Sequence, residues 1–121
     1  MALFERLRAR AAGSDGENRA LAHLRAQGLR LITRNYRCKG GEIDLIMASP
    51  RGETVFVEVR VRNRSDFGGA AASVGARKQQ RLIRAAHHYL AGLPSLPPCR
   101  FDVVAIDAGQ IEWLPDAFGL A

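Results

Sequence analysis

Apolar and polar residues alternate through much of the first half of the chain, which predicts a run of β-strands. The alternation is clearest over 54–62, where valines occupy every second position from Val55. Residues 29–34 and 41–48 show the same period of two, and the turn-forming sequence Ser-Pro-Arg-Gly separates the second and third strands. On the second strand we expect one face to carry Ile43, Leu45 and Met47, and the other Glu42, Asp44 and Ile46. On the third strand the face opposite the valines is expected to carry Phe56, Glu58, Arg60 and Arg62.

Two other segments show the longer period of amphipathic helices. Ser14-Asp15-Gly16-Glu17 has the form of a capping box, and the helix that it opens is expected to end at Gly28. Residues 74–91 are predicted to form a second helix, followed by strands over 100–107 and 111–114. Because a strand–helix–strand crossover implies a parallel pair, the predicted fold class is α/β with a mixed sheet and helices packed on it.

Length and composition indicate one globular domain. The 121 residues are 47% hydrophobic and 25% charged, which excludes a disordered, collagen-like or disulfide-stapled class. We expect a single domain over 1–121, in which residues 1–13 add a loosely ordered helical segment. Cys38 and Cys99 form no C-x-x-C pair, so free thiols in a reducing cytoplasm are expected. No apolar run is long enough for a membrane span, and charged residues interrupt the N-terminal segment, so no secretory signal is expected.

The charge balance favours polyanionic partners, nucleic acid first and an anionic membrane second. Eighteen basic residues against twelve acidic ones give a net charge of +6. Between positions 60 and 84 the only acidic residue is Asp66. The candidate nucleic-acid contacts in this stretch are Arg60, Arg62, Arg77, Lys78, Arg81 and Arg84. Those on the second helix also fit a simple solvated helix face, so both interpretations stay open.

The predicted hairpin of the second and third strands brings two carboxylates together. If Ala48 pairs with Thr54, Asp44 falls opposite Glu58, with Cβ atoms about 5 Å apart. Two carboxylates at that distance repel by roughly 3 kcal/mol at an effective dielectric of about 20. A shared proton, a neighbouring Arg or a divalent cation must relieve this repulsion. Oxygen ligands favour Mg²⁺ or Mn²⁺ over zinc.

The residues on this face are typical of phosphodiester hydrolysis, but ordinary structural roles also explain them. A metal held by carboxylates polarises a phosphate and lowers the pKa of an attacking water, while a cation such as Arg60 stabilises the developing charge. The alternatives are that Asp44 and Glu58 are ordinary solvent-face strand residues and that Glu42 and Arg60 form a surface salt bridge.

Several sequence blocks resemble a known family. Gly-Glu-Ile-Asp-Leu-Ile at 41–46 and Val-Glu-Val-Arg at 57–60 resemble the D…(E)-x-K signature of the restriction-endonuclease-like (PD-(D/E)XK) nuclease superfamily. More closely, the chain resembles the bacterial YraN-type family, which is assigned to that superfamily. Further matching blocks are Gly16-Glu17, Arg34-Asn35-Tyr36-Arg37, Phe67-Gly68 and the segments 77–82 and 100–104. The resemblance implies a restriction-endonuclease-like core, similar to that of archaeal Holliday-junction resolvases.

The resemblance also implies roles for individual residues. Asp44 and Glu58 would be the principal metal ligands, joined by Glu17 from the first helix, although the capping box also explains Glu17 completely. Gln79 or Gln80 would correspond to a helix glutamine near the site. Arg60 departs from the family pattern, which has Lys there. Arg can clamp a phosphate but cannot act as a base, and Lys78 on the second helix is an alternative source of an ammonium.

The sequence therefore predicts a nucleic-acid-binding protein, and more narrowly a DNA endonuclease that depends on Mg²⁺ or Mn²⁺. Its catalytic residues would be Glu17, Asp44, Glu58 and Arg60. The alternative is a catalytically degenerate binding module in which Arg60 replaces the catalytic Lys. A third interpretation is that the basic faces dock an acidic protein or an anionic membrane. DNA is preferred to RNA only through the resemblance, and a homodimer would suit cleavage of two strands, but no segment predicts an interface.

Overall fold

The computed structural model describes residues 15–62, 74–107 and 109–119. A helix covers residues 15–26, which we call the N-terminal helix. The remaining elements are β1 (Arg30–Cys38), β2 (Gly41–Ala48), β3 (Thr54–Arg62), α3 (Ala76–Ala91), β4 (Cys99–Asp107) and β5 (Gln110–Phe118). This is the predicted order of helix, three strands, helix and two strands. The capping residue Ser14 and the Phe67-Gly68 block lie outside the described residues.

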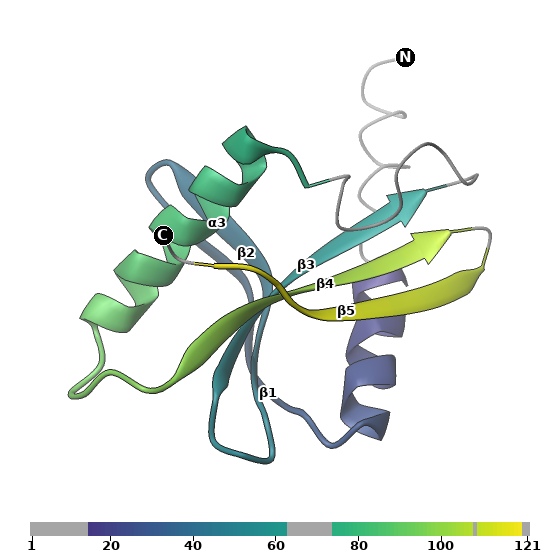
Figure 1. Cartoon of the computed structure of the whole chain (residues 1–121), viewed down its shortest axis with the longest axis horizontal. Coiled ribbons are helices and arrows are strands. Elements are labelled where there is room, and N and C mark those ends of the chain that lie inside the picture. Colours follow the sequence, from purple (N-terminus) through teal and green to yellow (C-terminus); the bar gives the residue numbers. More distant parts are fainter. Residues whose placement is uncertain (1–14, 63–73, 108, 120–121) are drawn as a thin grey trace.

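The five strands form one mixed sheet in the order β1-β2-β3-β4-β5 (Figure 1). β3 and β4 are parallel, because α3 connects them as a crossover, and all other neighbours are antiparallel. The predicted α/β class is confirmed, and the arrangement is compatible with a restriction-endonuclease-like core. No helix within the described ranges is long and apolar enough to cross a membrane.

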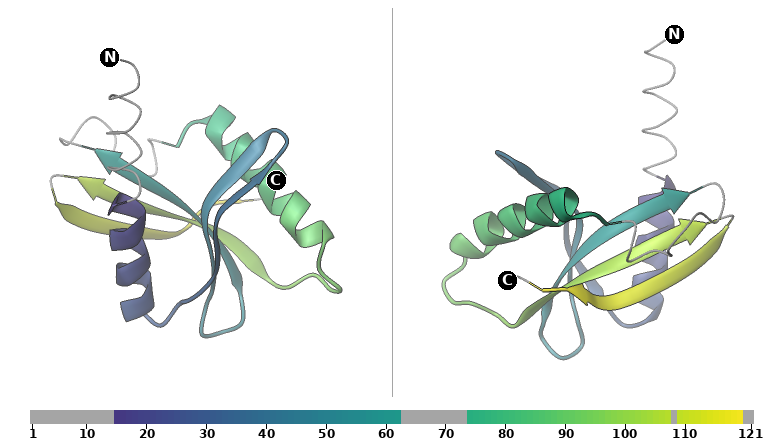
Figure 2. Two further views of the ribbon diagram at one scale, coloured as in Figure 1. Left: turned by 180° about the vertical axis from the view of Figure 1, so that it is seen from behind. Right: turned by 45° about the horizontal axis from the view of Figure 1, so that its top comes forward.

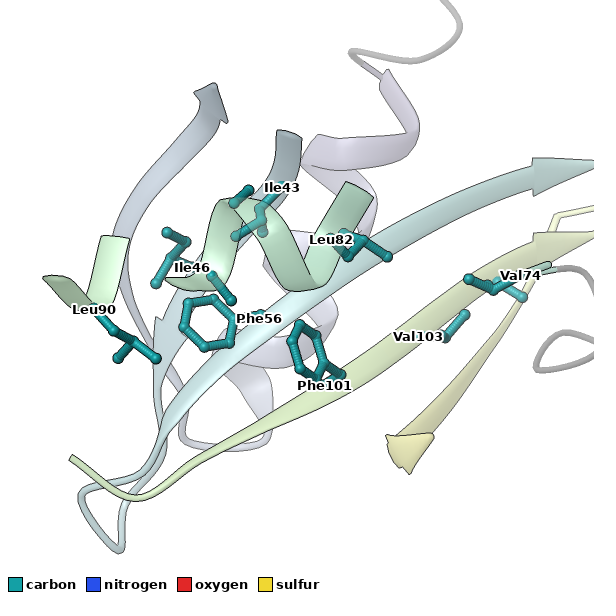
Figure 3. Packing of buried hydrophobic residues seen from close by; sticks show 11 residues of the cluster. Ile43, Ile46, Phe56, Val74, Leu82, Leu90, Phe101 and Val103 are labelled. Carbon is teal, nitrogen blue, oxygen red and sulfur yellow. The ribbon is translucent and has the colours of Figure 1, made fainter. Parts of the chain in front are cut away.

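The two helices cover opposite faces of the sheet, as the front and rear views show (Figures 1 and 2). On one face, α3 packs Leu82 and Leu90 against Phe56 and Phe101 of the sheet (Figure 3). On the other face, Leu21, Leu24 and Ala20 of the N-terminal helix pack against valines of β3. The predicted alternation of β3 is therefore confirmed, and it places Glu58 and Arg60 on the α3 side, in line with Phe56.

The edge strands are longer than the sequence pattern predicts. β1 extends to Cys38, because Tyr36 and Cys38 pack against the buried residues between α3 and the sheet, which we call the α3 cluster. β5 extends to Phe118, which stacks on Phe101 with ring centroids 4.8 Å apart. Asp116 has a φ of 52°, which breaks the alternation of side chains along β5. Period-two analysis therefore did not reveal that β5 continues to Phe118. Both predicted free thiols are confirmed.

The predicted face of Ile43 is wrong. Leu45 and Met47 share a face as expected, and they pack with the N-terminal helix. Ile43 instead lies in the α3 cluster together with Ile46. The alternation of β2 therefore reverses at Asp44. Asn35 lies opposite Asp44, since the flanking pairs are Arg34↔Leu45 and Tyr36↔Ile43, and its φ is 55°. A left-handed residue changes the side to which the following side chains point, so the β1–β2 ribbon turns over at this position.

Candidate functional site

The β2–β3 hairpin has the predicted register, and that register brings Asp44 to Glu58. Pairing runs from Ala48↔Thr54 to Leu45↔Val57 and stops one residue before the two acids. The Asp44 carboxylate then accepts a hydrogen bond from the backbone N–H of Val59 at 2.8 Å. The side chain of Asp44 thus takes the place of a regular ladder bond, where β2 departs from β3 beside Glu58.

Glu58 is a buried acid with incomplete hydrogen bonding. Only 3% of the residue is exposed, and Oε1 has no hydrogen-bond partner among the described residues. Oε2 lies 3.5 Å from Arg60 Nη1 and 3.6 Å from Lys78 Nζ. Burial, and next the repulsion by Asp44 and a hydrogen bond to its carboxyl group, raise the pKa of Glu58 to about 8, although Lys78 and Arg60 oppose the rise. With this pKa, Glu58 keeps its proton at neutral pH.

Glu17 approaches this pair from the N-terminal helix. Its carboxylate lies 3.5 Å from Arg34 Nη2 and accepts a hydrogen bond from the Asn35 side chain. Burial and the nearby charge of Asp44 raise the pKa of Glu17 in spite of these two donors. Within the described ranges, no three Asp, Glu, His or Cys side chains converge closely enough to hold a metal. The converging acids are therefore the pair Asp44 and Glu58, with Glu17 adding negative charge beside Asp44.

Cationic side chains enter the site from α3 as well as from β3. Lys78 Nζ lies between two acids, 3.3 Å from Glu42 Oε1 and 3.6 Å from Glu58 Oε2. Arg81 Nη2 lies 3.7 Å from the same oxygen of Glu42. Burial opposes the effect, but Lys78 and Arg81 lower the pKa of Glu42, so this acid stays ionised. Glu42 thereby holds both cations on the side of α3 that faces Glu58.

The remaining predicted residues lie around the site or outside it. Gln79 donates from Nε2 to the carbonyl oxygen of Val74 at 2.9 Å, and Gln80 is exposed. Arg77 and Arg84 are also exposed, on the solvent side of α3. The side chain of Arg62 lies outside the described residues. The structure thus brings together Asp44, Glu58, Arg60 and Lys78, with Glu17 beside them.

Sequence reasoning missed Arg34 and Asn35 as the partners of Glu17. Both lie in a block that the family resemblance had already drawn attention to, but as strand residues they carried no chemical signal. The available signal was an Asn directly after the predicted strand over 29–34, because Asn is depleted in strands and tolerates left-handed backbone.

The donor set fits a hard divalent cation. A buried carboxylate oxygen without a hydrogen-bond donor is rare, and here it lies next to a second carboxyl group. A divalent cation would replace the proton of Glu58 and give this acid a partner in its ionised form. Mg²⁺ and Mn²⁺ prefer such oxygen ligands, and Mg²⁺ is commonly held by one or two carboxylates plus water and substrate phosphate.

Sequence comparisons identify the family. The model of "Uncharacterised protein family UPF0102" matches residues 16–106, a range that contains every acid of the site. A UPF0102 protein of Cupriavidus necator is 62% identical over 106 residues, which cover 88% of this chain and 81% of the relative. A UPF0102 protein of Ralstonia pickettii is 57% identical over 114 residues, covering 91% of each. The family predicted from the sequence motifs is confirmed: the chain belongs to UPF0102.

Proposed function

We propose that this protein is a metal-dependent nuclease that hydrolyses phosphodiester bonds, with DNA as its preferred substrate. The observation that carries the proposal is Glu58, a buried acid whose Oε1 receives no donor, which lies beside Asp44 and has two cations next to its other oxygen. The buried acid Asp102, by contrast, has its oxygens paired by Arg100, Trp113 and the Asp116 N–H. Among the described residues, buried side-chain oxygens without a partner occur at Glu58 and at Asp107, and Glu58 is the one that has a second acid and two cations beside it. DNA rather than RNA is preferred because of the superfamily resemblance.

The side chains of the site have separable roles in this proposal. Asp44 and Glu58 would hold Mg²⁺ or Mn²⁺, which when bound polarises the phosphate and lowers the pKa of the attacking water. Glu58 must give up its proton for this, so loading is a proton-releasing step. Lys78 and Arg60 would bind the scissile phosphate and stabilise the charge that develops on its oxygens. Glu17 would act on Asp44 through its negative charge.

The basic face of α3 would bind the phosphates beyond the cleavage point. Arg81 belongs to the site through Glu42, whereas Arg77 and Arg84 are exposed about one turn to either side of it. These residues lie on one surface with Lys78, so a nucleic-acid backbone held there would pass the carboxylate pair. The net charge of +6 favours such a partner.

One observation favours a second candidate function, a nucleic-acid-binding module without hydrolytic activity. Arg60 stands where the superfamily pattern has Lys, and its guanidinium is already within 3.5 Å of Glu58. An Arg there neutralises the carboxylate but cannot lose a proton to assist the attacking water. Such a module would bind nucleic acid with a steep salt dependence and without a metal requirement.

The deciding experiment is a cleavage assay on labelled single-stranded, duplex and four-way-junction DNA, with matched RNA, in Mg²⁺, Mn²⁺ or EDTA. Wild type is compared with Asp44→Asn and with Glu112→Gln, which removes one exposed charge from β5. Metal-dependent cleavage that is lost in Asp44→Asn and kept in Glu112→Gln supports the nuclease. Binding without cleavage supports the second candidate and makes Arg60→Lys the next variant. If wild type neither binds nor cleaves, both proposals fail.

A further inference from the structure

We propose that Asn35 is a positioning residue for this site: its left-handed backbone turns the β1–β2 ribbon over and so directs Asp44 into the gap between β2 and β3. The inference rests on the proposed function for what the site does. The part of the inference that concerns how the site is built rests on the fold alone. A separate experiment tests each of these two parts.

The backbone of Asn35 is unusual for its place. Among the described non-glycine residues, positive φ values occur at Asn35 and Asp116, with φ of 55° and 52°. Asn35 is the sixth residue of a nine-residue strand, where an extended backbone is the rule. Left-handed backbone is costly for residues with a Cβ, and Asn and Asp tolerate it best. A residue kept in this conformation within a strand therefore has to be held there by its surroundings.

The turnover of the ribbon is visible in both strands. On β1, Arg34 reaches Glu17 of the N-terminal helix, whereas Tyr36 packs against the α3 cluster on the opposite face of the sheet. On β2, Leu45 packs with the N-terminal helix and Ile43 with α3. The register is constant from Thr33↔Ile46 to Cys38↔Gly41, and the irregularity of this ribbon lies earlier, between Leu31 and Thr33. The reversal at the Asn35–Asp44 position therefore adds no residue to either strand.

The turnover has a direct consequence for Asp44. In an undistorted strand its side chain would project from one sheet face, as the neighbouring side chains do. Here its carboxylate instead accepts the Val59 N–H at 2.8 Å, a backbone donor within the sheet. This orientation places the carboxyl group beside Glu58 on one side and within the electrostatic reach of Glu17 on the other. The hairpin register already brings Asp44 opposite Glu58, so what the reversal adds is the proximity of Asp44 to Glu17.

The side chain of Asn35 adds a second contribution. It hydrogen-bonds Glu17, so the same residue that turns the ribbon also holds the acid that approaches from the N-terminal helix. The backbone and amide contributions can be separated by substitution. Asn35→Gly keeps the left-handed backbone and removes the amide, whereas Asn35→Ala removes the amide and also disfavours the backbone conformation. The proposal assigns the position of Asp44 to the backbone, so Gly must rescue what Ala loses.

The first test measures the hydrogen bond that defines the position of Asp44. Amide hydrogen exchange of Val59 is followed by NMR in wild type, Asn35→Gly, Asn35→Ala and Asp116→Ala. Asp116→Ala is the matched control, because it makes the same kind of change at the other left-handed position, on β5. We expect Asn35→Ala to lose roughly tenfold or more of the Val59 protection, equivalent to one hydrogen bond to a charged group. Asn35→Gly and Asp116→Ala should retain it.

Three results would overturn the proposal. Asn35→Ala with wild-type Val59 protection would show that the Asp44 position does not depend on this backbone. If Asn35→Gly lost as much Val59 protection as Asn35→Ala, the effect would come from the side-chain amide of Asn35. If Asp116→Ala lost as much, the effect would come from general destabilisation of the protein.

The second test connects the geometry to the site. Mn²⁺ affinity is measured by titration calorimetry on the same four proteins, and Asn35→Ala should bind roughly tenfold or more weakly, with Gly restoring the affinity. If wild type does not bind Mn²⁺, the proposed function fails while the Val59 result still decides the role of Asn35. If wild type binds and Asn35→Ala binds equally well, Asn35 does not position this site.

Discussion

Lys78 Nζ lies 3.6 Å from Glu58 Oε2 and therefore brings an ammonium to the buried acid from helix α3. The strand position two residues after Glu58, where the superfamily pattern has Lys, is occupied by Arg60. The site thus contains the planar guanidinium of Arg60, from the same strand as Glu58, and the compact ammonium of Lys78, from α3. These two cations are not equivalent, since only the ammonium can approach an attacking water as a point charge.

Substitution of Lys78 should accordingly cost more activity than substitution of Arg60. We expect Lys78→Ala to lower the cleavage rate by roughly 10²-fold or more, the usual effect of removing one group that stabilises transition-state charge. Lys39→Ala is the matched control, because Lys39 is the only other lysine of the chain and is exposed in the β1–β2 turn. The measurement is single-turnover cleavage at saturating protein. Equal rates for the Lys78 and Lys39 variants would remove Lys78 from the mechanism.

Glu58 should make the metal-free protein less stable as the pH rises. Its pKa is about 8 in the folded protein against 4.5 for the ordinary group, so the unfolded chain binds fewer protons than the native state between these values. The free energy of unfolding therefore falls as the pH increases from about 4.5 to about 8.

Glu58→Gln should remove this pH dependence and raise Tm at pH above 8. A gain of about 1 kcal/mol corresponds to roughly 4 °C in a domain of this size. Thermal unfolding in EDTA from acid to alkaline pH measures the effect, with Glu112→Gln as the control on an exposed acid. A lower Tm for Glu58→Gln throughout the range would mean that the ionised carboxylate is stabilising, and the account of the pair given above would be wrong.

A divalent cation should reverse the cost of ionising Glu58. Since protons compete for the same oxygens, Mn²⁺ should raise Tm more at pH 8 than at pH 6, and the shift should grow with the logarithm of its concentration. Asp44→Asn should abolish the shift without unfolding the protein. Differential scanning fluorimetry with and without Mn²⁺ gives this comparison. A shift of the same size in wild type and Asp44→Asn would place the binding elsewhere on the chain.

Asp102 offers a contrast between a structural acid and a site acid. It is fully buried, but Arg100 contacts both of its oxygens at 3.0 and 3.2 Å, and Trp113 and the Asp116 N–H complete its bonding. Asp102→Asn breaks a buried, fully paired charge and should cost about 3 kcal/mol or more. At pH above about 8, where Glu58 is ionised, Asp44→Asn should cost little or raise the stability, because it removes the charge that repels Glu58. Chemical denaturation of both variants measures the difference, and equal losses would contradict it.

Sequence patterns predicted the elements of this fold well, and the site only in part. Val55 and its alternating neighbours specify β3, and turn residues fix the β2–β3 register, so the meeting of Asp44 and Glu58 followed from local rules. The reversal at Asn35 did not, because period-two analysis assumes an extended backbone at every position. The contacts of Lys78 with two strands also depend on how α3 packs across the sheet, which no local pattern encodes.

The arginines of α3 should contribute to the affinity for nucleic acid. Arg77 and Arg81 are exposed on the helix that carries Lys78, so each can neutralise a phosphate and release its counterions. The double variant Arg77→Ala/Arg81→Ala should weaken binding at every sequence tested and reduce the slope of log K against log salt by roughly two. The matched control is Arg25→Ala/Arg30→Ala, which removes the same charge from exposed positions on the N-terminal helix and β1. Fluorescence anisotropy with labelled DNA at several salt concentrations measures both slopes. Equal slopes for the two double variants would mean that net charge alone drives binding. If α3 binds the phosphates, the Arg77→Ala/Arg81→Ala variant must lose contacts that the control variant retains.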